Sequence, residues 1–188
     1  MTKKILSTLT ALEAALADPG DSAEKIGLLA RALRWQSNFD AEDLAALRML
    51  GEFVQSKRGD EYWEVERAVY EILCDHATPE HLPLLLKAYH LRGTHADDRR
   101  RLALQGLSRL AALTGDSTAL ETLGAALSHN KADTRGWAIG FLADAYFALQ
   151  HPLPNPILTR LRAIAQNDPS PDVRAEAVNV MNNERMRL

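Results

Sequence analysis

Leucine and alanine recur along most of the chain at spacings of three and four residues, with polar residues between them. This period is typical of amphipathic helices. It predicts helices over residues 3–17, from Asp21 to about Gln36, and from Asp40 to about Gln55. The last of these is apolar on nearly all sides, which indicates a helix that is covered all round. Alternating β-branched runs are missing, so the sequence predicts no strands.

After residue 60 the predicted helices repeat a pattern. In one set an alanine stands four residues before a large apolar residue, and the aligned alanines are Ala68, Ala103, Ala138 and Ala177, at offsets of 35, 35 and 39 residues. A second set lies between them, and its aligned leucines are Leu85, Leu123 and Leu161, at offsets of 38 and 38 residues. Each unit is therefore one helix, a short turn, a second helix and a loop. Periods of this length are typical of α-solenoids.

Three helices of the first set begin with an aspartate two residues before an arginine. The pairs are Asp98/Arg100, Asp133/Arg135 and Asp172/Arg174. An acidic residue in the first turn suits the helix dipole. Because catalytic groups do not recur at every period, we interpret these pairs as a ladder between neighbouring repeats that satisfies helix ends.

The stretch Asp172-Val173-Arg174-Ala175-Glu176-Ala177 resembles the first helix of a HEAT-like repeat. His81-Leu82-Pro83-Leu84-Leu85-Leu86 similarly resembles the second helix of such repeats. The period is shorter than the ~40–47 residues usual for HEAT and armadillo repeats. The chain therefore looks more like the short bacterial form, which is also found in phycobilisome lyases. A tetratricopeptide array, with a period of ~34 residues, is the second interpretation.

The resemblance implies an all-α fold, namely a right-handed α-solenoid of antiparallel helix pairs that forms an armadillo-like superhelix. We expect a single domain over residues 1–188. Within it, residues 1–58 are expected to form divergent N-terminal capping helices, and residues 60–186 the HEAT-like repeats.

Composition and charge argue against some classes of partner. The chain has 188 residues, 46% of them hydrophobic, and a net charge of −3. Nucleic-acid-binding proteins normally carry a basic excess, so this balance argues against nucleic acid as the partner. The single cysteine, Cys74, cannot form an internal disulfide, which indicates the reducing cytoplasm. No stretch of 18 apolar residues exists, so no transmembrane helix and no membrane partner are expected.

The histidines and the cysteine do not form the pattern of a metal site or of a catalytic site. None of the six histidines has the spacing of a zinc-binding helix, and a metal site needs three converging ligands. Cys74 lies beside Asp75 and His76, and a neighbouring histidine can activate a thiol. The preceding Ile72 and Leu73 favour a packed, unreactive thiol instead. We therefore expect no enzymatic activity, no metal and no cofactor.

Acidic side chains gather between Asp60 and Glu80, where seven acids accompany one base. Either this run is a set of solvated helix faces, or it is a polarised surface that docks a charged protein. The acidic-patch candidates are Glu64, Glu66 and Glu71. The aromatic residues Tyr62, Trp63, Trp137 and Phe141 lie on or near the first helices and are interpreted as packing residues.

In HEAT-like solenoids the second helices line the concave face. On those helices the candidate partner-binding residues, opposite the leucine core, are Leu84, Lys87, Glu121, Thr122 and Arg160. The row is mixed in polarity, which is typical of a protein-docking groove. We predict a non-enzymatic scaffold or adaptor that docks a protein partner there, in the class of assembly factors or immunity proteins. The alternative is a HEAT-like nucleic-acid-binding protein or DNA glycosylase, in which Arg99-Arg100-Arg101 with Arg92 and Lys87 would contact phosphate, although Asp97 and Asp98 dilute their charge.

Overall fold

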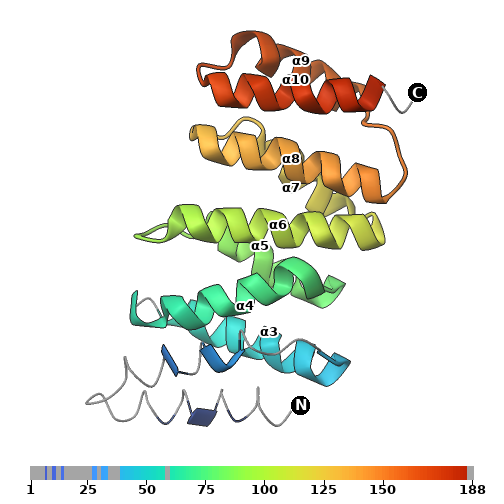
Figure 1. Cartoon of the computed structure of the whole chain (residues 1–188). Helices are drawn as coiled ribbons and strands as arrows, with labels where there is room; N and C mark the ends of the chain where they lie inside the picture. The colour runs from blue at the N-terminus through green and yellow to red at the C-terminus, as the bar shows by residue number, and fades with distance from the viewer. Residues whose placement is uncertain are drawn as a thin grey trace. The chain divides into compact units, whose positions relative to one another are not determined.

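The structure, a computed structural model, describes residues 39–57 and 60–185, together with positions 7, 10, 11, 14, 27, 28 and 31–33. The predicted helices over 3–17 and from Asp21 to Gln36 lie almost wholly outside the described residues. The described part of the chain is all-helical and contains no strand, as the sequence predicts (Figure 1). Within these residues, no helix is both long and apolar enough to span a bilayer.

Within the described residues from 41 onward, ten helical elements follow one another, two of them short 3-10 helices (η). In chain order they are α3 (Ala41–Ser56), η2 (Asp60–Tyr62), α4 (Trp63–His76), η3 (Pro79–His81), α5 (Leu82–His90), α6 (Ala96–Thr114), α7 (Ser117–Ala126), α8 (Ala132–Ala148), α9 (Asn155–Asn167) and α10 (Pro171–Arg185).

The helices lie where the hydrophobic period predicts them. The aligned alanines fall on α4, α6, α8 and α10, and the aligned leucines fall on α5, α7 and α9. All seven side chains are at most 1% exposed. The phase of the predicted pattern is therefore confirmed in each of these helices, because the residues that define it are the ones that the packing buries.

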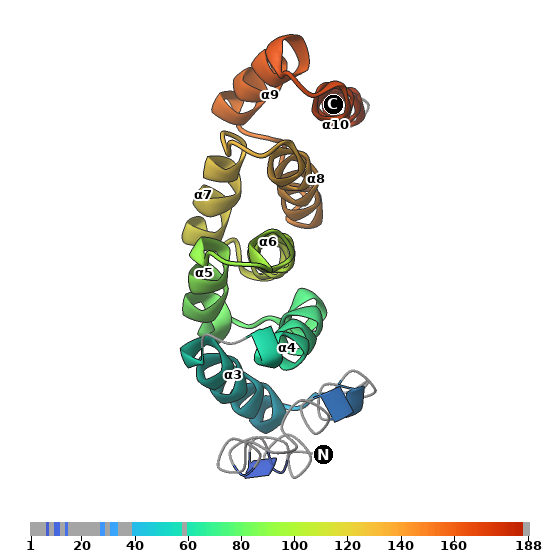
Figure 2. The same ribbon diagram turned by 90° about the vertical axis from the view of Figure 1, so that its left-hand side faces the viewer.

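The chain divides into two compact units, residues 1–106 and residues 107–188, with the boundary inside α6. In the first unit, α4 and the beginning of α6 form one layer, and α3 and α5 form the other (Figure 2). In the second unit, α8 and α10 form one layer, and α7 and α9 form the other. The solenoid arrangement and the single domain over residues 1–188 stay predictions.

Side-chain caps fix the beginnings of two helices. At the start of α3, Asp43 N donates to Asp40 Oδ1 at 2.8 Å, and Asp40 N donates to Asp43 Oδ2 at 3.3 Å. This reciprocal pair is a capping box with aspartate in place of glutamate. At the start of α7, Ala119 N donates to Asp116 Oδ1 at 2.9 Å. Both caps satisfy backbone donors that lack a partner within the helix.

Two glycines allow the helices of the first unit to approach closely. A Cβ at Gly51 of α3 would lie 2.6 Å from Leu84 Cδ2 of α5. A Cβ at Gly106 of α6 would lie 2.9 Å from Leu85 Cδ2. Helix α5 therefore buries two successive leucines, one against α3 and the other against α6.

Candidate functional site

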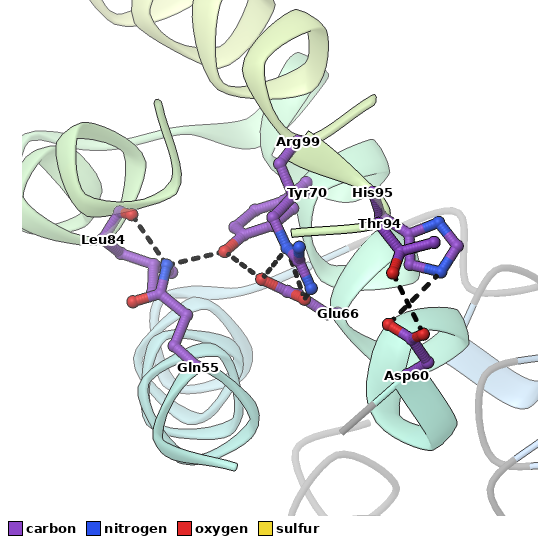
Figure 3. A network of polar contacts seen from close by, with 8 residues as sticks. All are labelled: Gln55, Asp60, Glu66, Tyr70, Leu84, Thr94, His95 and Arg99. Carbon is purple, nitrogen blue, oxygen red and sulfur yellow. Dashed lines mark hydrogen bonds and ion pairs between the residues drawn. The ribbon is translucent and has the colours of Figure 1, made fainter. Parts of the chain in front are cut away.

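A chain of buried polar side chains joins α3, α4 and α5 in the first unit (Figure 3). Gln55 Nε2 donates to the Tyr70 hydroxyl at 2.6 Å and to the Leu84 carbonyl at 3.0 Å. The Tyr70 hydroxyl donates in turn to Glu66 Oε1 at 2.9 Å. Burial, together with the charge of Glu66, raises the pKa of Tyr70, so its hydroxyl stays a proton donor. A network whose members are paired in this way is rigid.

Glu66 is also the partner of an arginine from α6. Arg99 Nε donates to both carboxylate oxygens of Glu66, at 3.1 and 2.9 Å, and Arg99 Nη2 donates to Oε2 at 2.8 Å. The Arg99 guanidinium lies 5.1 Å from the centre of the Trp63 ring, which stacks on His95 at 4.5 Å. Held on two sides in this way, Arg99 has one orientation.

The predicted acidic patch is wrong for Glu66. Its side chain is buried, with the residue 3% exposed, because it stands three, four and seven positions before Val69, Tyr70 and Leu73 on the buried face of α4. Glu71 is half-buried and accepts from Arg67 Nε at 2.7 Å. Of the three predicted acids, only Glu64 is exposed.

The predicted row on the second helices is wrong at one position. Leu84 is 3% exposed, because α3 covers the side of α5 that was expected to face a partner. Lys87, in the first unit, is exposed. The other three lie in the second unit, where Glu121 and Arg160 are exposed and Thr122 is half-buried. Arg160 Nη1 donates to the Gly124 carbonyl at 3.4 Å, which ties α9 to α7.

The predicted ladder is confirmed in part at Arg135, which joins neighbouring repeats, although its partner Asp168 is not one of the aspartates of the motif. Its Nε and Nη2 donate to the two carboxylate oxygens of Asp168, both at 2.7 Å, and its Nη1 donates to the carbonyls of His129 and Asn130 at 2.9 and 3.1 Å. The hydrogen bonds from Arg135, and one from the backbone of Ser170, hold the pKa of Asp168 below its usual value. The pair therefore ties the loop before α8 to the loop before α10.

The other two arginines of the motif form hydrogen bonds close to or within their own helices. Arg174 Nη1 donates to the Asp168 carbonyl at 2.6 Å, just before its own helix. Arg100 Nη1 donates to Asp97 Oδ1 at 2.6 Å within α6, so it does not join two repeats. In the first unit the link between neighbouring helices is made by the adjacent residue, Arg99.

His81 and Cys74 are both packed residues. The His81 ring donates from Nε2 to the Leu44 carbonyl at 3.0 Å and accepts at Nδ1 from the backbone N–H and hydroxyl of Thr78, at 3.1 and 2.8 Å. Burial lowers the pKa of His81. Burial, and then the charge of Asp75, raises the pKa of Cys74 to about 12, which confirms the predicted packed thiol. The described residues form no cluster of three metal-ligating side chains.

A groove runs between α8 and α10 in the second unit. It consists of two adjoining cavities of about 420 and 300 Å³, which share Gly140, Asp144 and Glu176. We call it the α8–α10 groove and define it by four carboxylates, three aromatic residues and two glycines: Asp133, Asp144, Asp172, Glu176, Trp137, Phe141, Phe147, Gly136 and Gly140. No lysine or arginine lines either cavity.

The two glycines keep the floor of this groove open. A Cβ at Gly136 would lie 3.9 Å from Val173 Cγ2, and one at Gly140 would lie 3.7 Å from Glu176 Oε1. Both are ordinary contacts, so the packing of α8 on α10 does not require glycine at either position. Both glycines line the larger cavity, and Gly140 also lines the smaller one together with Phe147, which is 62% exposed.

The sequence carried a signal for this groove. Asp133, Gly136, Trp137, Gly140 and Phe141 follow one another at spacings of three, one, three and one, and Asp144 continues the series. These positions lie on one face of a helix. Acids, glycines and aromatics on one face do not suit a core, and this combination could have identified the surface.

A second cavity, of about 690 Å³, lies in the first unit where α3 and α5 end. We call it the α3–α5 basin, and its polar lining comprises Gln55, Ser56, Lys57, Asp60, Glu66, Lys87, His90, Arg92, Thr94 and Arg99. Three residues of the network drawn in Figure 3, namely Gln55, Glu66 and Arg99, line this basin. The basin contains Lys87, one of the residues that the sequence assigned to partner binding.

Comparison with known proteins adds no identification. No protein family, no curated protein and no solved structure matches the chain. The resemblance to HEAT-like repeats therefore stays a prediction.

Proposed function

We propose that the chain is a non-enzymatic protein-binding scaffold, and that it holds a basic, partly apolar segment of its partner in the α8–α10 groove. One observation carries this proposal: the groove combines four carboxylates with three aromatic side chains, of which Phe147 is exposed and Trp137 and Phe141 are half-buried, and no cation lines it. The proposal moves the main docking surface from the second helices of the repeats, where the sequence put it, to the first helices.

The chemistry of the groove selects cationic side chains. Aromatic faces attract ammonium and guanidinium groups, and carboxylates accept paired hydrogen bonds from arginine. Aromatic side chains also anchor interfaces, because they bury a large area at a small entropic cost. A segment that alternates arginine or lysine with apolar residues would fill both requirements.

The spacing of the acids gives the length of the segment. Asp133 and Asp144 stand eleven residues apart on α8. At about 1.5 Å per helical residue, they are separated by about 16 Å along the helix axis. An extended peptide rises about 3.3 Å per residue, so about five residues would span this length.

The Arg135–Asp168 pair is expected to hold one end of the groove in shape. Asp168 accepts from Ser170 N at 2.9 Å, and Ser170 lines the larger cavity. Because both carboxylate oxygens of Asp168 are also held by Arg135, the loop that carries Ser170 is fixed to α8. A groove that is formed before binding avoids the entropic cost of ordering its walls.

The architecture that we propose for this scaffold is a single right-handed α-solenoid over residues 1–188, with HEAT-like helix pairs and a capping N-terminal segment. The alternating helices, the buried alanine and leucine positions and the Arg135–Asp168 link support it. A lone, buried cysteine thiol is compatible with the reducing bacterial cytoplasm.

The test is peptide binding measured by fluorescence anisotropy. A labelled peptide of alternating arginine and leucine should bind the intact chain, and the double variant Asp144→Asn/Glu176→Gln should bind it about tenfold more weakly, a difference of about 1.4 kcal/mol. The matched control is Glu64→Gln/Glu121→Gln, which removes two exposed charges outside the groove. If the control variant weakened binding as much as the groove variant, the assignment to the groove would be wrong.

The same experiment separates the alternative function. Duplex DNA in place of the peptide should not compete for binding. If the chain bound duplex DNA with a steep dependence on salt, the nucleic-acid interpretation would replace the scaffold.

A further inference from the structure

The α3–α5 basin in the first unit contains an unmatched group of cations. Lys57, Lys87 and Arg92 all line this cavity of about 690 Å³. All three are exposed, and Lys57 Nζ lies 5.2 Å from the centre of the Phe53 ring. Among the described residues, no carboxylate forms an ion pair with any of the three. Their charge is therefore available to a ligand in the basin.

The acids of the basin are already occupied. Glu66 accepts three hydrogen bonds from Arg99 and a fourth from the Tyr70 hydroxyl. Asp60 accepts from Thr94 Oγ1 at 3.2 Å, and its other oxygen lies 3.8 Å from His95 Nε2 (Figure 3). The charge of Glu66 is therefore matched by Arg99, whereas Asp60 is exposed and keeps its charge, so the three cations of the basin outnumber the one unmatched carboxylate.

The shape of the basin is set before any ligand enters. Gln55 and Glu66 belong to the buried network, and the face of Trp63 covers Arg99. This part of the lining is therefore a satisfied, rigid surface, whereas Lys57, Lys87 and Arg92 stand on flexible stems. Rigid walls with adjustable cations suit the recognition of a small anion with several oxygens.

We propose that the α3–α5 basin binds a small phosphate-bearing molecule, with Lys57, Lys87 and Arg92 as its charge partners. Lysine binds phosphate as a point charge, and arginine offers a planar fork that matches two phosphate oxygens. The volume lies within the range of small-molecule sites, about 300–1,000 Å³. The proposal does not depend on the α8–α10 groove, which lies in the other unit.

Isothermal titration calorimetry at low ionic strength tests the proposal. Inorganic pyrophosphate should bind the full chain with one-to-one stoichiometry and a Kd on the order of 1 mM or tighter. Lys87→Gln and Arg92→Gln should each weaken it about fivefold, and the double variant should abolish the signal. Lys87→Arg, which keeps the charge, should retain binding. These residues are exposed, and unchanged circular dichroism would confirm that the variants fold.

Arg162→Gln is the matched control, because it removes one exposed cation of α9 in the second unit. It should leave pyrophosphate binding unchanged. An equal loss in this variant would show that net charge, and not the basin, attracts the anion, and the absence of any heat with the wild-type chain would overturn the proposal.

Two further ligands, ATP and citrate, test which kind of anion the basin recognises. If ATP bound more tightly than pyrophosphate, the proposal would be supported and the ligand would be a nucleotide. If ATP bound no more tightly, the proposal would be supported, and the basin would recognise only the phosphate groups. Citrate binding as tightly as pyrophosphate would contradict the assignment to phosphate.

Discussion

Glu66 and Arg99 form an ion pair between α4 and α6, in which Glu66 is buried and Arg99 is half-buried, and their positions differ by 33 residues. Arg135 and Asp168 form a second ion pair, which is buried, again 33 residues apart and with the order of the charges reversed. Both separations are slightly shorter than the repeat period. Each unit therefore contains an ion pair that fixes one helix pair on the next. In the first unit the acid comes first in the sequence, and in the second unit the base comes first.

Asp168→Ala should destabilise the second unit by about 3 kcal/mol. Asp168 and Arg135 are each 8% exposed, so the variant leaves a buried guanidinium without its carboxylate. It also removes the acceptor of the Ser170 N–H. Urea denaturation followed by circular dichroism measures the loss.

Asp172→Ala is the control for that experiment, because Asp172 is exposed in the first turn of α10. It should cost well under about 1 kcal/mol. Equal losses in the two variants would contradict the structural role of the Arg135–Asp168 pair.

Acid should weaken the fold in two separate pH windows. The pKa of His81 is lowered, so the unfolded chain binds the proton more readily, and stability falls as the pH drops below about 6.5. The pKa of Asp168 is also lowered, so its contribution is present above about pH 4 and is lost as the pH falls through the folded-state pKa. Urea denaturation at a series of pH values should show both losses.

The His81 part of this prediction can be checked directly. In an NMR titration, the His81 ring should protonate only below about pH 6.5. His81→Gln should reduce the slope of stability against pH between about 6.5 and 5, although it removes a buried hydrogen bond and lowers stability at pH 7. A ring that protonates above pH 6.5 would show that the buried site does not exclude the charge.

Alanine should have opposite effects at two helical glycines. At Gly51 the new methyl group would lie 2.6 Å from Leu84 Cδ2 and 3.2 Å from Val69 Cγ1, so we expect a net loss of about 1–3 kcal/mol. At Gly140 it would meet only an ordinary contact, so the helix propensity of alanine should stabilise the chain by up to about 1 kcal/mol. Thermal unfolding measures both, and a stabilising Gly51→Ala would refute the close approach of α3 and α5.

The helices from residue 41 onward were predictable, because their period and caps are local properties of the sequence. Asp40 begins α3 as predicted, and the aligned alanines are buried as predicted. Burial of Glu66 and Leu84 was not predicted. The pattern of one helix gives its apolar face, but it does not say how many neighbours cover that helix. Leu84 is buried because α3 packs on α5 at Gly51, a contact between segments about 30 residues apart.

The candidate surfaces were harder to predict for a related reason. Trp137 and Phe141 were interpreted as packing residues, because aromatic side chains at helical spacing are usually part of a core. In the structure both are only half-buried, and they line a cavity together with Gly136 and Gly140. The cations of the basin were predicted only in part. The sequence grouped Lys87 of α5 and Arg92 of the following loop as phosphate contacts, but Lys57 comes from the end of α3, far away in the sequence, and was not grouped with them.

The central claim is that the α8–α10 groove holds a basic segment, and the indole N–H of Trp137 reports on it most directly. In ¹H–¹⁵N spectra of the full chain, a peptide that alternates arginine and leucine should shift the Trp137 indole signal in a saturable way, while the buried Trp63 signal stays in place. A peptide with glutamate in place of arginine should leave both signals unchanged. If the arginine peptide did not move the Trp137 signal, or if the glutamate peptide moved it equally, the proposed function would be contradicted.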